Sequence, residues 1–250
     1  MSQSDLTQLL ESWPYEPGRV NARRITGCDG RPKLQLRIDM GVMQMEMEGR
    51  PDGKRPEGFE SLLAYQLDRL ECYVEQSGGP EGFVLSSDEC RAMREEAVQY
   101  YHRYVGLLAL GEHDAVVRDT NRNERLFDLC REYAADDADR TILEQFRPYV
   151  IMMRARAEAE AALSQGGTQH ALAAIDSGLA QIKTVLEQAG GGEVFEQANE
   201  VQLLRGMRDA LVPKLPMSQR VELQERLQAA INAENYELAA VLRDELKLLR

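Results

Sequence analysis

Histidine and cysteine are the residue types in this chain that could bind a metal or act as nucleophiles. The histidines stand apart in the sequence: His102, His113 and His170. The cysteines are also widely spaced, without the CxxC pair typical of zinc and redox sites: Cys28, Cys72, Cys90 and Cys130. We find no HExxH, Walker loop, dinucleotide fingerprint or nucleophile elbow. We therefore expect no enzyme activity, no metal and no cofactor. An enzyme of unrecognised type stays open, and a cavity with displaced pKa values would indicate it.

A second group of candidate functional residues is a run of basic side chains between residues 19 and 37. Asp29 is the only acidic residue in this run. Its basic members are Arg19, Arg23, Arg24, Arg31, Lys33 and Arg37. Such a hairpin could bind phosphate, nucleic acid or an acidic partner. Alternatively, it is a solvated strand face or one that faces the protein's own acidic helices. Salt-sensitive affinity for DNA or RNA would identify a nucleic-acid accessory protein.

The segment from Gln219 to Arg250 contains no Gly and no Pro and predicts two helices. The first carries an apolar face at helical spacing: Leu223, Leu227, Ala230 and Ile231. The second carries another: Ala239, Leu242, Leu246 and Leu249. Ser218 and Asn235 are the expected N-caps. Two helices this short are marginal alone, so we expect their remaining apolar strip to need a further surface.

This segment resembles the UVR motif. That motif is shared by the B and C subunits of the bacterial nucleotide-excision nuclease, some Clp-type ATPases and activators of protein arginine kinases. Its core is an aromatic residue, Glu, any residue, Ala-Ala, two residues and Arg-Asp. The matching residues are Tyr236, Glu237, Ala239, Ala240, Arg243 and Asp244. The chain departs mildly from the motif at Tyr236, where Phe is more frequent, and at Ile231, where a small residue is common.

The resemblance, over residues 218–250 only, implies an antiparallel helical hairpin that binds a partner protein and performs no catalysis. The implied partners are a nuclease subunit, a Clp-type ATPase or a protein kinase, in DNA repair or in a stress response. Self-pairing into a homodimer and folding back on the chain itself are the alternatives. We expect the contact surface to comprise Leu223, Leu227, Tyr236, Ala239, Ala240, Arg243, Asp244 and Leu246. The chain would then be a non-catalytic adaptor or scaffold. In the nucleic-acid alternative, the basic hairpin at 19–37 would bind nucleic acid and the C-terminal hairpin would recruit the nuclease.

Composition is that of an ordinary globular protein. Of 250 residues, 43% are hydrophobic and 29% are charged, and the net charge is -12. This acidity argues against unspecific binding to DNA or to anionic membranes. The segment from Met1 to Glu11 lacks the basic start and apolar stretch of a signal peptide. We expect a cytoplasmic protein with reduced thiols and no membrane association.

Residues 1–77 predict a small antiparallel sheet with a covering helix. A strand from Val20 to Thr26 leads into the hairpin signal Asp29-Gly30, and alternation then predicts a return strand with one buried face. The apolar phase flips at Gly41, which predicts a bulge or a bend in one long strand. The helix expected at residues 59–76 should cover this sheet.

Residues 86–212 predict a helical body. Ser86 and Glu89 form a capping-box pattern at its start, and a helix expected at residues 136–164 should be kinked by Pro148. The body weakly resembles tetratricopeptide-like repeats, although its glycines do not keep that repeat's spacing. The expected fold class is mostly α with a small N-terminal antiparallel β-hairpin sheet (α+β). It is a helical array that ends in an antiparallel helical hairpin over residues 216–250.

Overall fold

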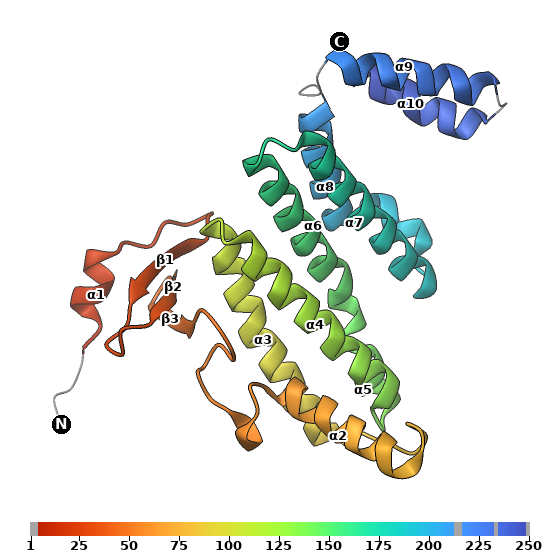
Figure 1. Cartoon of the computed structure of the whole chain (residues 1–250). Helices are drawn as coiled ribbons and strands as arrows, with labels where there is room; N and C mark the ends of the chain where they lie inside the picture. The colour runs from red at the N-terminus through yellow and green to blue at the C-terminus, as the bar shows by residue number, and fades with distance from the viewer. Residues whose placement is uncertain (1–4, 213–216, 233–234, 249–250) are drawn as a thin grey trace. The chain divides into compact units, whose positions relative to one another are not determined.

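The computed structural model describes residues 5–212, 217–232 and 235–248. The described chain is mostly α-helical with one antiparallel sheet near the N-terminus, which confirms the expected fold class (Figure 1). It forms two compact units, Met1–Val150 and Ile151–Arg250. The sheet therefore belongs to the same unit as the first helices of the expected body. None of the helices in the described part combines the length and apolar content needed to span a bilayer.

Three strands form the sheet in the order β1 (Asn21–Thr26), β2 (Pro32–Ile38) and β3 (Gly41–Glu46). Ile38 pairs with Gly41, so residues 39–40 form a two-residue hairpin turn. Gly41 is therefore neither a bulge nor a bend, and that expectation was wrong. The apolar phase flips because pairing across a two-residue turn places even-numbered residues opposite odd-numbered ones, as in Leu34 opposite Met45.

The helix that covers the sheet is α3 (Ser87–Ala109). A Cβ added at Gly106 would lie 2.7 Å from Leu36 Cδ2 and 2.9 Å from Leu34 Cδ2, so the glycine permits this close approach. The helix expected at residues 59–76 is α2 (Leu62–Ser77), which packs on α3. The expectation that α2 covers the sheet was wrong, because the apolar side chains Leu34 and Leu36 of the sheet pack against α3.

The remaining elements of the first unit are helical. They are α1 (Thr7–Ser12), η1 (Pro56–Gly58), α4 (His113–Tyr133), α5 (Asp137–Thr141) and η2 (Glu144–Phe146). Ser86 caps α3 with both hydrogen bonds of a capping box to Glu89, as expected. The single helix expected at residues 136–164 is divided into α5, η2 and α6 (Arg147–Ser164), so Pro148 lies in the first turn of α6 and not inside one long helix. Proline is tolerated in a first helical turn, where its missing N–H costs nothing.

The second unit continues from α6 through paired helices to the C-terminal hairpin. Its elements are α7 (Thr168–Gln188), η3 (Gly192–Gln197), α8 (Asn199–Leu211), α9 (Met217–Asn232) and α10 (Tyr236–Leu248). The Leu238 N–H donates to Asn235 Oδ1 at 3.1 Å, which confirms Asn235 as the cap of α10. Helix α9 begins at Met217, and the Ser218 side chain, which was expected to cap it, lies outside the described side chains.

Candidate functional site

The C-terminal hairpin has an internal apolar seam between α9 and α10. Leu223, Ala230, Ala239 and Leu242 are buried in it, and Leu227 and Leu246 pack against them. Ala239 is small enough to let the two helices approach closely. Four residues expected at the partner surface therefore lie in the seam instead: Leu223, Leu227, Ala239 and Leu246.

Other apolar side chains remain on the outside of the hairpin. Tyr236 is 71% exposed, Val241 51%, Ile231 44% and Leu238 42%. Of these only Tyr236 belongs to the expected surface. A helical projection could have found Leu238 and Val241, because each directly precedes a seam residue in the sequence.

Arg243 and Asp244 are exposed beside this outer surface. Arg243 Nη2 lies 3.2 Å from Asp244 Oδ1, and Lys247 Nζ lies 3.0 Å from the same oxygen. Hydrogen bonds from Lys247 and Arg243 lower the pKa of Asp244. Such exposed pairs add little to stability, so both charges can be rearranged toward a partner at small cost.

The hairpin also meets α7 and α8 within the second unit. Arg208 Nε lies 2.7 Å from Asp176 Oδ1 on α7, and Arg208 Nη2 lies 2.5 Å from Glu245 Oε1 on α10. Leu238 and Val241 line a shallow groove of about 350 Å³ at this contact. Part of the hairpin's apolar surface thus faces the protein's own helices. Tyr236 and Arg243 are not part of the groove lining given by the described side chains.

Three of the four strand residues in the basic run share one face of the sheet, and the fourth lies on the other face. Register places Arg23, Lys33 and Arg37 on one face and Arg24 on the other. The side chains of Arg19 and Arg24 pair with Glu16 and Glu112, respectively.

The two basic side chains on the central strand are engaged internally. Lys33 pairs with Asp29 at 2.7 Å and also with Glu46. Arg37 Nε donates to the Trp13 carbonyl at 2.9 Å. Both faces of β2 are consequently buried, whereas alternation predicted one buried face.

Arg23 stacks on Trp13, 4.0 Å from the ring centroid, and donates to Gln35 Oε1 at 2.8 Å. Arg31 is exposed in the turn between β1 and β2. The described residues therefore form no continuous basic face at 19–37, and the nucleic-acid alternative gains no support from the geometry.

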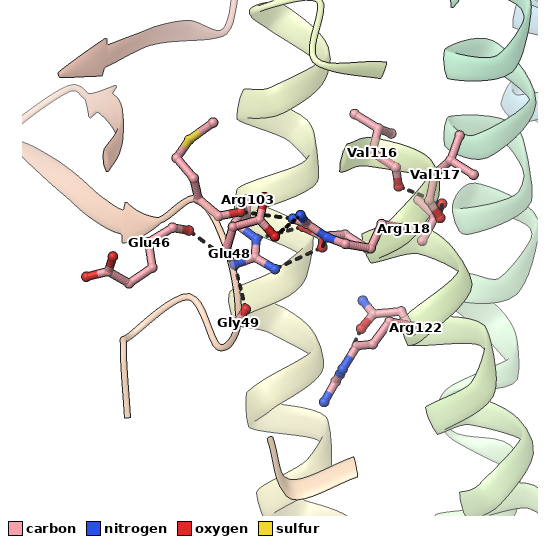
Figure 2. Close-up of polar contacts among 12 residues, drawn as sticks. Glu46, Glu48, Gly49, Arg103, Val116, Val117, Arg118 and Arg122 are labelled. Atoms are coloured by element: carbon pink, nitrogen blue, oxygen red, sulfur yellow. Dashed lines mark hydrogen bonds and ion pairs between the residues drawn. The ribbon is translucent and has the colours of Figure 1, made fainter. Parts of the chain in front are cut away.

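A buried ionic cluster joins the end of β3 to α3 and α4 (Figure 2). Arg103 binds Asp119 through two hydrogen bonds of 2.7 and 2.8 Å and donates to the carbonyl oxygens of Glu46 and Gly49. Arg118 reaches Glu48 at 2.6 Å and Asp119 at 2.9 Å. This cluster was not predicted from the sequence, because its members come from segments far apart in the chain.

A second part of the same cluster centres on Glu96, which is fully buried. Its carboxylate accepts from the Leu62 and Leu63 N–H groups at the start of α2 and pairs with Arg122 and Arg50. One sequence signal was available for this region. Arginines at 118, 122 and 125 share the i, i+4, i+7 spacing of one helix face.

Among the described residues, no three or more histidine, cysteine, aspartate or glutamate side chains lie close enough together to bind a metal ion. Burial lowers the pKa of His102. Cys90 and Cys130 are buried together, and burial raises the pKa of Cys130 to about 12. Such a thiol stays protonated and unreactive at neutral pH.

Comparison with known proteins identifies the C-terminal segment. Residues 219–250 match the UVR family model, described as the UvrB/uvrC motif. This confirms the resemblance drawn from the sequence. UVR motifs occur in proteins that interact with partner proteins or DNA. Comparisons with curated proteins and with solved structures gave no match.

Proposed function

We propose that this chain is a non-catalytic adaptor that binds a partner protein through the outer surface of its C-terminal hairpin. The observation that carries this proposal is the division of the hairpin into two surfaces. The seam is buried within the hairpin itself, whereas Tyr236 and Val241 are more than half exposed. An interface built on the outer side chains would leave the seam intact.

The stripe formed by Tyr236, Ala240 and Arg243 suits the centre of such an interface. These residues are spaced i, i+4 and i+7, so they share one face of α10. Tyr and Arg dominate the residues that carry binding energy at protein interfaces. Ala240 between them allows a partner helix to approach closely, and the Arg243–Asp244 pair can set its register.

By family resemblance, the partner is a nuclease subunit, a Clp-type ATPase or a protein kinase. A second copy of this chain is the competing occupant, because two identical hairpins can bury each other's outer strips. Light scattering on the full chain distinguishes the two. A monomer that binds a candidate partner supports the adaptor, and a stable dimer that excludes the partner supports self-pairing.

Substitution of the outer side chains tests the proposal directly. We expect Tyr236→Ala to weaken binding to the candidate partner about 10- to 100-fold, as at an aromatic hot spot, with the melting temperature unchanged. Val241→Ala should weaken it less. Calorimetric titration of each purified variant with the partner measures both effects.

Val98→Ala is the matched control, since Val98 on α3 is 52% exposed and Val241 is 51% exposed. It should leave affinity unchanged. If Tyr236→Ala binds as tightly as the unsubstituted chain, the outer surface is not the interface.

A further inference from the structure

A cleft of about 190 Å³ lies between α2 and α4, with Tyr100 of α3 among its lining residues. Its α4 wall carries the arginine stripe Arg118, Arg122 and Arg125. Figure 2 shows Arg118 and Arg122 projecting from α4 toward α3. The α2 wall is mainly apolar: Leu63, Ala64 and Leu67. The cleft thus combines a cationic wall with an apolar one.

The lining carries more positive than negative charge, although the chain as a whole has a net charge of -12. Its arginines are Arg103, Arg118, Arg122 and Arg125, and its acids are Glu60 and Asp119. Asp119 is already bound by Arg103 and Arg118. Arg122 pairs with Glu96, which lies outside the lining, so the positive charge without an ion-pair partner among the described residues is that of Arg125.

Both of these arginines retain donor capacity. Arg122 Nε is buried and has no acceptor among the described residues, while its other nitrogens donate to Asn123 Oδ1 and to Glu96. Arg125 is exposed at the rim, and the described chain offers it no ion-pair partner. A buried guanidinium N–H without an acceptor is uncommon in folded proteins, and a bound ligand could supply the missing acceptor.

Arg122 pairs with Glu96, and Arg50 pairs with the same carboxylate. Burial lowers the pKa of Arg122 to about 9, and the nearby positive charge of Arg50 contributes. An anion bound in the cleft would offset both effects, because it supplies an acceptor and an opposite charge.

We propose that this cleft binds a small phosphorylated molecule. The phosphoryl oxygens accept hydrogen bonds from Arg122 and Arg125, and the body of the ligand lies against the α2 wall. A phosphoryl group offers several acceptors for the free donors of Arg122 and Arg125, and guanidinium groups bind it with directed, charge-assisted hydrogen bonds. The volume suits a phosphoryl group with a short body, since pockets for drug-sized ligands are about 300–1,000 Å³.

The test is calorimetric titration of the full chain with inorganic phosphate and with phenyl phosphate at constant ionic strength. We expect both to bind, and phenyl phosphate to bind more tightly because its ring contacts Leu63 and Leu67. Arg125→Gln and Arg122→Gln should each weaken binding at least tenfold. Arg125→Lys should recover part of the loss, because it keeps the charge but not the planar donor set.

Arg131→Gln is the control, since Arg131 is an exposed arginine on the same helix but is not among the residues that line the cleft. Arg125 is exposed, so its variant keeps the test valid even if Arg122→Gln fails to fold. The proposal is overturned if neither probe binds at millimolar concentration, or if Arg131→Gln loses as much affinity as Arg125→Gln. Binding confined to a phosphorylated peptide would also overturn it, by assigning the cleft to a protein ligand. The hairpin substitutions at Tyr236 and Val241 do not touch this cleft, so the two proposals fail independently.

Discussion

At the scale of single residues, the buried charged side chains Arg103 and Glu96 each have several hydrogen-bond or ion-pair partners. Arg103 satisfies two carboxylate oxygens and two carbonyl oxygens, and Glu96 accepts from two backbone N–H groups and pairs with two arginines. A buried ion is tolerated under these conditions because hydrogen bonds replace the lost hydration.

Asp119→Asn should therefore be strongly destabilising. It removes the charge that balances Arg103 while the guanidinium stays buried, and breaking such a pair costs about 3–5 kcal/mol. Urea denaturation of both proteins measures the difference. The double variant Arg103→Met, Asp119→Leu should lose less than Asp119→Asn alone, since no uncompensated charge remains. A larger loss in the double variant would contradict this account.

Glu89→Gln should show a stability cost that depends on pH. Burial opposes ionisation of Glu89, but hydrogen bonds from Ser86 and Arg69 outweigh it and lower the pKa of the carboxylate. A lowered folded pKa contributes stability above the unfolded value of 4.5, and that stability is lost as pH falls through the folded pKa. We expect Glu89→Gln to cost about 1 kcal/mol at pH 7 and progressively less as the pH falls below 4.5.

Thermal melts at several pH values follow this difference. Asp88→Asn in the same helical turn is the control, because its exposed side chain pairs with Arg91 one turn away and with no other described side chain. It should change stability by about 0.5 kcal/mol or less at each pH. A pH-independent cost for Glu89→Gln would mean that the capping box acts through shape rather than charge.

At the scale of secondary-structure elements, two glycines allow a helix to approach its neighbour closely. Gly106 brings α3 onto the sheet, and Gly178 brings α7 against α6, where an added Cβ would lie 2.5 Å from Ala155 Cβ. These contacts require a residue without a side chain, whatever its intrinsic helix propensity.

Gly178→Ala should destabilise the second unit by about 1–3 kcal/mol, because the new methyl group overpacks the contact with Ala155. Gly206→Ala in α8 is the matched control, since nothing lies within 4 Å of its added Cβ. It should stabilise by about 0.5–1 kcal/mol through helix propensity alone. Chemical denaturation monitored by circular dichroism gives both values. Equal effects of the two substitutions would show that α6 and α7 can separate without cost.

At the scale of the whole molecule, each compact unit carries one proposed interaction. The phosphoryl cleft lies in Met1–Val150 and the partner-binding hairpin in Ile151–Arg250. The net charge of -12 repels anions at long range, so binding in the cleft must rely on short-range hydrogen bonds from arginine. Selectivity for a bound phosphoryl group would follow from that local geometry.

The features that the sequence alone determined are local. The α9–α10 hairpin, the Asn235 cap and the Ser86–Glu89 capping box depend on residues within a few positions of one another. Helical spacing and capping are encoded at that range, so they are readable without a fold.

Only the tertiary structure decided which surfaces remain free. Leu223 and Tyr236 both belong to the same motif, yet packing buries the first and leaves the second exposed. Arg103 and Asp119 meet because α3 and α4 pack together, and the carbonyl oxygens that complete the site come from the end of β3 and from the loop after it. Such pairings depend on how elements far apart in the chain close on one another, and no local pattern specifies the partner.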